Sequence, residues 1–532
     1  MSVRHSIQYI QQLYDSGQDR SLLEDLIRAW RGIQKLDPKD PDSYWMIAGF
    51  HGEPFRGPGA TDQDWWGGYC NHANILFPTW HRAYLLRLEN ALQKIPGCGH
   101  VTLPFWDELL DPVQPIPSIF TSPTFDLDGD TCNPLYSYKL QEDLDEMVIG
   151  ADNRYTKPAG YETVRFPLSG LVGTEEDRDH TAAWNQDFAD PDSRNTLLNN
   201  NVRQWLEGTI VIEKDPGGRI PDTYSVRSRY ERCLQAPNYT VFSNTVSQGQ
   251  WTEDNGLEQD VVVSLESPHN AIHLAVGGFY QAGVYNANPT PILYANGDMG
   301  DNETAGFDPI FFFHHAFIDY AFWTWQKLHN RTKPGSLDVI EDYPGTVLTE
   351  GQAGEPPLPA GTKLSTSTPL YPFRTASGEF FTSDDVTNIE DQLGYRYGPG
   401  SLDPQLRLTP GPVRPPAKIK RVSGINRGDY AGSFVIRLFA TRASDGERVE
   451  VGREAVLSRL SVAGCRNCQS SLAIRTHVPL PRELLAALAG RGKVEDITYD
   501  CEIQTHLLPG LRNVQPGQMP VTAPPHVVID DV

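Results

Sequence analysis

The sequence predicts a mainly α-helical core with long loops, followed by a small all-β sandwich. Apolar residues recur at three-to-four spacing in several segments before residue 400, whereas short segments after residue 417 alternate apolar and polar residues. Between the two regions, six prolines at 399–417 form the densest proline stretch of the chain, which is typical of an extended spacer. We therefore expect a core domain at residues 1–400, a linker at 401–417, a sandwich at 418–512 and a tail at 513–532.

The helices of the core are indicated by apolar stripes and by start signals. Asp42 and Ser43 precede an apolar run in the manner of an N-cap, and Pro78 suits the first turn of the next helix. Only one clear helix is expected between about residues 107 and 260, where Pro, Gly, Asn and Asp predict long surface loops. The expected helices are residues 22–33, 44–50, 78–92, 193–206, 267–275 and 310–328.

The C-terminal module has the two-residue period of strands at 433–439, 472–478 and 497–503. Between Lys418 and Arg512 the chain carries 15 basic and 10 acidic residues, a net charge of +5. The whole chain has 45 basic and 68 acidic residues, net −23, and the linker and tail carry +1 and −2, so the core at 1–400 carries −27. A basic module and an acidic core attract each other.

Charge and hydropathy also limit the expected partners. A negative field repels phosphate backbones and anionic lipid headgroups, so neither nucleic acid nor a membrane is an expected partner. No run of 18 apolar residues occurs, and residues 1–17 lack the apolar centre of a secretory signal. We expect a soluble, cytoplasmic protein, and the sequence leaves open whether it forms homo-oligomers.

Two groups of histidines have the spacing of metal ligands. His269 and His273, four positions apart on an expected helix, lie on one face and can reach one metal, which needs a third ligand from elsewhere. The helix that begins near His314 and His315 offers that ligand. Asp319, one turn beyond His315, is expected to orient it.

A second potential triad consists of His51, His72 and His81, which lie at a helix end, in a Gly-rich loop and at the next helix start. Six neutral imidazoles around two divalent ions leave about four positive charges uncompensated, which dinuclear zinc enzymes meet with bridging carboxylates. Two Cu(I) ions carry half that charge and suit imidazole, and bound dioxygen balances the oxidised pair. The residues therefore favour two copper ions over two zinc ions.

The segments around these histidines resemble the type 3 copper proteins, and most closely the tyrosinases of the long fungal kind. They are His51-Gly52, Cys70-Asn71-His72, Phe77 to Arg82, Leu103 to Asp107, Leu265 to His273, Phe307 to Asp319 and Tyr395-Arg396-Tyr397. The resemblance covers about residues 1–400. It implies an antiparallel helix bundle that holds two copper ions, with dioxygen as co-substrate and small phenols as substrates.

By this resemblance, the first copper is bound by His51, His72 and His81, and the second by His269, His273 and His315. We choose His315 over His314 because the family's ligand precedes a helical Asp by four positions, as His315 precedes Asp319. His314 is expected to pack against the core.

The resemblance also implies roles around the metals. Cys70 would form a thioether with His72, and Phe311 would stack on a copper ligand. Glu266 and Asn270 would hold a water that takes the proton from a phenol. The alternatives are that Cys70 is a small buried thiol, that Phe311 is an ordinary core residue, and that Glu266 lies on the surface while Asn270 caps a helix.

The C-terminal module resembles the β-sandwich that covers the copper pocket of fungal pro-tyrosinases and keeps them latent. Cys465 and Cys468 would help to load copper, delivered by a donor, and we favour this role over a disulfide. The sequence does not decide which side chain fills the covered pocket. The candidates are the aromatic residues Tyr430, Phe434, Phe439 and Tyr499, and the aliphatic residues Leu457 and Leu460.

The function implied is that of a tyrosinase, which hydroxylates monophenols at the ortho position and oxidises o-diphenols to o-quinones. One alternative is a catechol or o-aminophenol oxidase with the same site but no hydroxylation of monophenols. A more distant one is a dioxygen carrier of the hemocyanin kind, against which the absence of tandem repeats argues.

Overall fold

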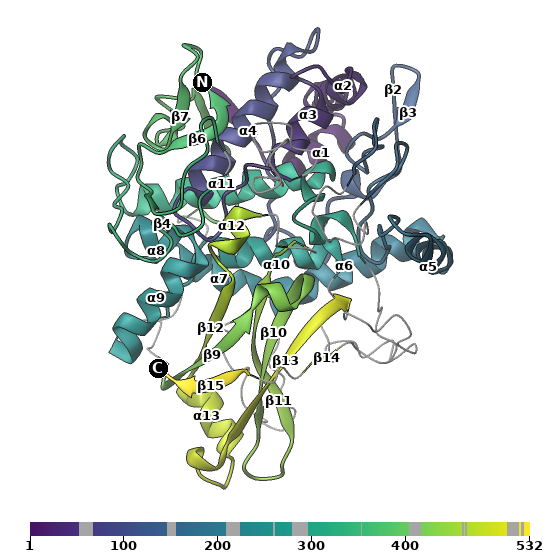
Figure 1. Ribbon diagram of the computed structural model, residues 1–532. Coiled ribbons are helices and arrows are strands. Elements are labelled where there is room, and N and C mark those ends of the chain that lie inside the picture. The colour runs from purple at the N-terminus through teal and green to yellow at the C-terminus, as the bar shows by residue number, and fades with distance from the viewer. Residues whose placement is uncertain are drawn as a thin grey trace.

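The computed structural model of the protein describes residues 1–52, 68–145, 156–208, 224–258, 261–278, 296–352, 354–403, 416–459, 462, 465–507, 521–522 and 526–532. The helices form the upper part of the molecule in Figure 1, and the long C-terminal strands project below them. We call residues 1–403 the core domain and residues 416–532 the C-terminal domain.

The core domain contains helices α1 (Ile7–Asp15), α2 (Ser21–Lys35), α3 (Tyr44–Gly49), α4 (Phe77–Lys94), α5 (Glu175–Gln186), α6 (Pro191–Glu207), α7 (Val226–Cys233), α8 (Tyr239–Ser243), α9 (Thr245–Asn255), α10 (Glu266–Gly277) and α11 (Ile310–Leu328). All six helices expected from the sequence are confirmed. The N-cap predicted at Ser43 is also confirmed, because its side chain accepts a hydrogen bond from the Met46 amide at 3.1 Å.

Helices α4, α10 and α11 lie at the centre of the core domain (Figure 1). Helix α11 is apolar on all sides, and every residue from Ile310 to Gln326 is buried, as expected of a helix with neighbours all round. Aromatic side chains join it to its neighbours. The Tyr84 ring of α4 lies 5.1 Å from that of Phe312, and Trp30 of α2 stacks on Phe313 at 5.5 Å.

The expectation of mostly loops between residues 107 and 260 was wrong, because α5, α7, α8 and α9 lie there besides α6. These four helices have polar sequences in which an apolar stripe is hard to recognise. Each nevertheless begins with a side-chain N-cap that was not predicted from the sequence. Those caps are Thr174, Ser225, Asn238 and Asn244, which accept from backbone amides at 2.9–3.1 Å.

Short strand pairs complete the core domain: β1 (Ser2–Arg4) with β8 (Tyr395–Tyr397), β2 (Thr124–Leu127) with β3 (Asp130–Cys132), β4 (Val347–Leu348) with β5 (Thr362–Lys363), and β6 (Pro369–Arg374) with β7 (Phe380–Thr382). The parallel pairing of β1 with β8 places Ser2 opposite Tyr395. The first residues of the chain are thereby attached to the segment that ends the core domain.

The C-terminal domain has two sheets, ordered β11-β10-β13-β14 and β12-β9-β15. Their strands are β9 (Lys418–Asn426), β10 (Ala431–Thr441), β11 (Arg448–Val456), β12 (Ala473–Leu480), β13 (Thr498–Leu507), β14 (Val521–Thr522) and β15 (Val528–Asp531). The three predicted strands are confirmed within β10, β12 and β13, and the sheets share one apolar core.

Two features of this domain differ from the prediction. It is not purely β, since α13 (Arg482–Ala489) buries Leu484, Leu485 and Leu488 in its core, and a short helix, α12 (Arg466–Gln469), lies beside the core domain. The predicted tail contributes β15, which pairs with β9 and places Ile529 opposite Val422. Most of the predicted linker, 404–415, lies outside the described residues.

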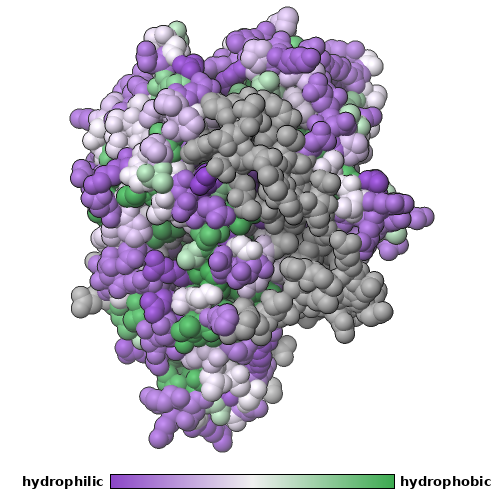
Figure 2. Space-filling view, viewed as in Figure 1, coloured by the Kyte–Doolittle hydropathy of each residue, from purple (hydrophilic) through white to green (hydrophobic). Residues whose placement is uncertain are grey.

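In Figure 2, hydrophilic residues cover most of the visible face, and the larger apolar patches lie low on it, toward the C-terminal domain. Within the described residues, no helix has the length and apolar character needed to cross a membrane.

Candidate metal centre

The first triad gathers residues from three separate segments. His51 follows the end of α3, His72 lies in the loop before α4, and His81 is in the second turn of α4. Their ring centroids lie 5.4–5.7 Å apart. His51 Nδ1 lies 3.2 Å from Asn302 O and His81 Nδ1 lies 2.7 Å from Phe77 O, while all three Nε2 atoms are buried and have no hydrogen-bond partner within the described part of the chain. Fixing Nδ1 in this way turns Nε2 toward a metal.

The second triad comes from two helices. His269 and His273 lie one turn apart on α10, and His315 faces them from α11. His315 Nε2 is 3.3 Å from Nε2 of both other histidines. Bonds of about 2.0–2.1 Å to one tetrahedral metal place two nitrogens about 3.3 Å apart, so the spacing suits a single ion. His273 Nδ1 lies 2.8 Å from Met299 O, which fixes that ring as well.

The two triads face each other across a short gap. The rings of His81 and His315 stack with centroids 4.4 Å apart, and those of His72 and His269 are 5.6 Å apart. Burial lowers the pKa of all six imidazoles, that of His81 to about 3, so the rings are neutral and their lone pairs are available. Among the residues that the structure describes, neither histidine group includes a carboxylate, and six neutral nitrogens fit a pair of copper ions.

Phe311 lies where the resemblance places a stacking aromatic residue. Its ring centroid is 4.1 Å from that of His315 and 4.8 Å from that of His51. One apolar ring therefore packs against a histidine of each triad and limits how far either can rotate.

Asp319 does not orient His315, contrary to the prediction. Its carboxylate accepts from Arg82 Nε at 2.5 Å and from the hydroxyls of Tyr395 and Tyr397 at 2.8 and 2.6 Å. His315 Nδ1 has no hydrogen-bond partner among the described residues. One turn along α11 carries Asp319 past the triad and into the reach of Arg82, so the carboxylate joins α11 to α4 instead.

Glu266 and Asn270 are both buried on α10 beside the second triad. Glu266 Oε1 accepts from the Ala73 amide at 2.8 Å, and its Oε2 accepts from the amide and hydroxyl of Thr245 at 3.0 and 3.1 Å. Asn270 Oδ1 lies 2.9 Å from His269 Nδ1. Burial raises the pKa of Glu266. The water and proton transfer expected of this pair stay a prediction.

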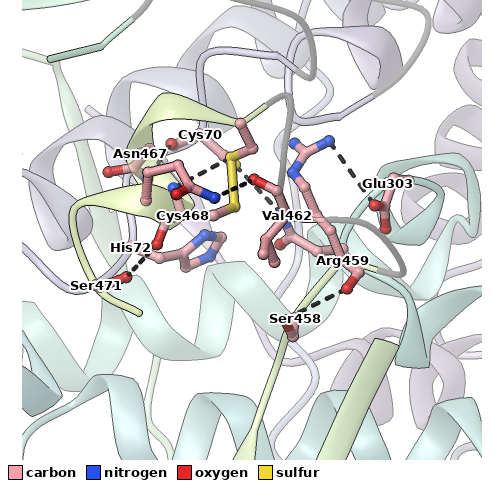
Figure 3. The surroundings of a disulfide bond; sticks show 12 residues. Cys70, His72, Glu303, Ser458, Arg459, Val462, Asn467, Cys468 and Ser471 are labelled. Atoms are coloured by element: carbon pink, nitrogen blue, oxygen red, sulfur yellow. Dashed lines mark hydrogen bonds and ion pairs between the residues drawn. A yellow bond between two sulfur atoms is a disulfide. The ribbon is translucent and has the colours of Figure 1, made fainter. Parts of the chain in front are cut away.

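Cys70 and the pair Cys465 and Cys468 meet near His72 (Figure 3). The preference for free thiols at 465 and 468 was wrong for this state of the protein, because the two cysteines form a disulfide. Cys70 is a buried free thiol, and its carbonyl accepts from Asn467 Nδ2 of α12 at 3.2 Å. The thioether to His72 and the copper-loading role stay predictions.

The aromatic candidates for the covering side chain stay within the C-terminal domain. Tyr430, Phe434 and Tyr499 belong to its core, and Phe439 packs under Arg448, whose guanidinium carbon lies 3.6 Å from the ring centroid. Of the aliphatic candidates, Leu457 is buried and lines a cavity of about 20 Å³ beside His72, and Leu460 lies outside the described residues.

Two arginines near the metal centre were missed by the sequence analysis. Arg427 and Arg459 of the C-terminal domain line the same cavity beside His72. Arg459 Nη1 lies 3.9 Å from a Glu303 carboxylate oxygen of the core domain (Figure 3). A lone arginine in a turn has no periodic signal, and the net charge of the module was the single hint.

A helical core with two facing histidine triads, covered by a sandwich, defines a dinuclear metalloprotein with imidazole ligands. A family model, the common central domain of tyrosinase, matches residues 41–328. The chain is 48% identical to a tyrosinase of Hahella sp. (strain CCB-MM4) over 90% of this chain and 88% of that protein. It is 42% identical to a tyrosinase of Aspergillus oryzae, with 86% of each chain covered.

Solved structures agree with these sequence matches. A tyrosinase from Burkholderia thailandensis at low pH superposes with a TM-score of 0.79 and 44% identity, covering 94% of this chain and 95% of that one. A pro-tyrosinase of Aspergillus oryzae shares the fold, with a TM-score of 0.64 and 19% identity over 99% of this chain and 92% of that one. This chain belongs to the tyrosinase family, whose cofactor is a pair of copper ions, and its six histidines fit that pair.

Proposed function

We propose that the protein is a tyrosinase that uses dioxygen to hydroxylate monophenols at the ortho position and to oxidise o-diphenols to o-quinones. The observation that carries the proposal is the pair of facing triads, with His81 stacked on His315 at 4.4 Å. Two copper ions bound there would supply the two electrons that reduce dioxygen, which a single Cu(I) cannot do. Family membership supports this activity.

The chain's own residues would bind, orient and deprotonate the substrate. Burial keeps the imidazoles neutral and therefore able to bind metal. Glu266 is a buried carboxylate with a raised pKa at the N-terminal end of α10, three residues before a ligand. A carboxylate in such surroundings is a stronger base than one in water, which suits removal of a phenol proton. Asn270, whose side chain is hydrogen-bonded to His269, would hold the water that connects Glu266 to the phenol.

The test compares a monophenol with its o-diphenol on the copper-loaded protein and on Glu266→Gln. We expect the variant to lose most hydroxylation while it retains diphenol oxidation, because only the first reaction needs the base. Glu231→Gln, at an exposed position on α7, is the matched control. Diphenol oxidation without any hydroxylation in the parent protein would favour the catechol oxidase alternative. Reversible oxygenation without turnover would overturn both.

We also propose that the C-terminal domain keeps the core latent. Leu457, Arg427 and Arg459 of the C-terminal domain line the cavity beside His72, a residue of the first triad. Acidic residues of the core pair with arginines of the covering domain: Glu253 with Arg475 at 2.7 Å and Arg421 at 3.4 Å, Glu303 with Arg459 at 3.9 Å, and Glu350 with Arg466 at 3.9 Å. These pairs have the polarity inferred from the charges of the two domains, whereas a further pair, Arg229 of the core with Glu454 of the covering domain, has the opposite polarity.

A protease site placed within residues 404–415 tests latency. We expect phenol oxidation to rise after cleavage and to rise further when salt releases the detached domain. Equal activity of the intact and cleaved proteins would contradict the proposal.

A further inference from the structure

A second cavity of the core domain, of about 340 Å³, lies between the segment 162–168 and the N-terminal part of α6. No histidine of either triad is among the described residues that line it. Apolar and aromatic side chains form most of its walls, and Phe120, Phe166 and Leu198 among them are buried. Tyr136, which is half-buried, adds a third aromatic ring. Pockets for small molecules have volumes of about 300–1,000 Å³ and combine such a lining with a few polar groups.

The charged side chains that line this cavity differ in whether they have a partner. Arg165 is neutralised, because its guanidinium forms an ion pair with Asp308 at 2.5 Å. Arg194 of α6 is half-buried and forms neither an ion pair nor a side-chain hydrogen bond within the part of the chain that the structure describes. Glu162, on the other wall, accepts a hydrogen bond from the Ser137 hydroxyl and has no cationic partner among the described residues. The cavity thus has one unpaired charge of each sign.

These two charges restrict the chemistry of a ligand. Arg194 and Glu162 line one cavity but do not pair with each other, so a ligand that carries both a carboxylate and an ammonium group can bridge them. A guanidinium binds a carboxylate through two parallel hydrogen bonds, and an ammonium group donates to a carboxylate. A ligand with a single charge would leave one of the two residues unpaired. The aromatic walls favour a ligand that also carries an aromatic ring.

We propose that this cavity binds a free aromatic amino acid, with its carboxylate on Arg194, its ammonium group on Glu162 and its ring against the aromatic walls. The site is separate from the metal centre, so the inference goes beyond the proposed function and does not depend on it.

Both walls of the cavity are attached to α10, the helix that carries two of the metal ligands. The Phe166 amide donates to the Val276 carbonyl at 2.9 Å, and Asn201 Nδ2 of α6 donates to the Ala275 carbonyl at 2.8 Å. An amino acid bound between the walls would therefore join two segments that both contact the end of α10. Because it binds the folded chain alone, it should raise the unfolding temperature.

The experiment measures the binding of L-phenylalanine to the full copper-loaded chain by titration calorimetry. L-Phenylalanine has no phenol hydroxyl and is therefore not a substrate of the proposed reaction. Two analogues separate the charges: 3-phenylpropionate lacks the ammonium group, and 2-phenylethylamine lacks the carboxylate. We expect each to bind about 10-fold more weakly than L-phenylalanine, because each loses one charge-assisted hydrogen-bonded pair. Titrations of the metal-free protein should give the same affinities, which separates this site from carboxylate binding to copper.

Two variants assign the charges to residues. Arg194→Met should weaken the binding of L-phenylalanine and 3-phenylpropionate about 10-fold and leave that of 2-phenylethylamine unchanged. Glu162→Gln should weaken the binding of L-phenylalanine and 2-phenylethylamine and leave that of 3-phenylpropionate unchanged. The matched control is Arg203→Met, because Arg203 lies on the same helix outside the cavity, where its Nη2 donates to Asn200 at 3.1 Å.

The inference is overturned if L-phenylalanine does not bind at millimolar concentration, or if it binds equally well to both variants and therefore lies elsewhere. An equal loss of all three compounds in either variant, with a lower unfolding temperature, would show damage to the fold and would also overturn it. A chain that oxidises no phenol would contradict the proposed function, but it would leave these affinities and the assignment of the cavity unchanged.

Discussion

Removing the charge of Glu454 should release the C-terminal domain from the core. Glu454, on β11, reaches across to α7, where its Oε2 lies 2.5 Å from Arg229 Nη1. Its other oxygen accepts from the Ser267 hydroxyl of α10 at 2.8 Å, two residues before His269. The side chains of Glu454 and Arg229 are 18% and 8% exposed, so the pair is largely removed from water.

The free-energy cost of removing the Glu454 charge depends on the hydrogen bonds that Arg229 would retain. Breaking a buried ion pair by removing one partner costs about 3–5 kcal/mol, since the remaining charge is left in a poor solvent. Arg229 still donates to the carbonyls of Tyr224 and Arg453, and Glu454 is not fully buried, so we expect about 2 kcal/mol. That is roughly a 30-fold shift of the docking equilibrium toward the open form.

The assay is the initial rate of diphenol oxidation by the intact chain, relative to the same chain cleaved within 404–415. Intact Glu454→Gln should gain roughly 30-fold in activity, whereas the cleaved forms should agree. Glu447→Gln is the matched control, because Glu447 pairs with Arg442 at 2.8 Å inside the C-terminal domain and is half exposed. Latency equal to that of the parent protein, together with a lower unfolding temperature, would refute a role for this pair in docking.

Four further predictions concern the metal centre and the cover. Asp319→Asn should lower the free energy of unfolding by about 3–5 kcal/mol in denaturant titrations, because Arg82 is left buried without its charge partner; a loss below 1 kcal/mol would contradict this. The free energy of unfolding of the metal-free protein should fall as the pH drops below about 6.5, by up to about 1.4 kcal/mol per pH unit for each imidazole. The reason is that the unfolded chain binds protons which the buried imidazoles, with their lowered pKa values, do not bind in the folded chain. Urea titrations at pH 7.5, 6.5 and 5.5 would measure this loss, and a free energy that does not change with pH would count against neutral buried rings. Salt at 1 M should raise the activity of the intact chain only a few-fold. The side chains of Arg475 and Arg421, which pair with Glu253, are 37% and 34% exposed, and ion pairs of this exposure contribute about 0.2–1 kcal/mol each. Complete activation by salt would show that these pairs contribute more than that. Reduction of the disulfide should speed copper uptake by the metal-free protein and leave a Cys465→Ser/Cys468→Ser variant slow, whereas equal uptake rates would remove the pair from copper loading.

The elements that carry the metal ligands were predictable because their signals are local. His269 and His273 are one turn apart on a helix with apolar flanks, and α11 is apolar enough to be recognised from its composition alone. The polar helices α5 and α7 were not recognised, because their stability comes from caps and tertiary contacts rather than from a wide apolar stripe.

Contacts between distant segments could not be predicted in the same way. Sequence spacing placed Asp319 one turn from His315, but it carries no information about Arg82 on another helix, which attracts the carboxylate. The route of the turn that brings Arg427 beside His72 is likewise set by the docking of two domains. Glu108 directly follows a motif that the sequence analysis singled out, yet its partner His314 lies 206 positions away.

The ion pair between Arg82 and Asp319 has a consequence for how the metal centre is assembled. Arg82 adjoins His81 of the first triad, and Asp319 lies one turn from His315 of the second, so this buried cross-link joins the helix of one triad to the helix of the other. A change that loosens this pair would therefore disturb both triads together rather than one alone, because each partner lies within one turn of a histidine of a different triad.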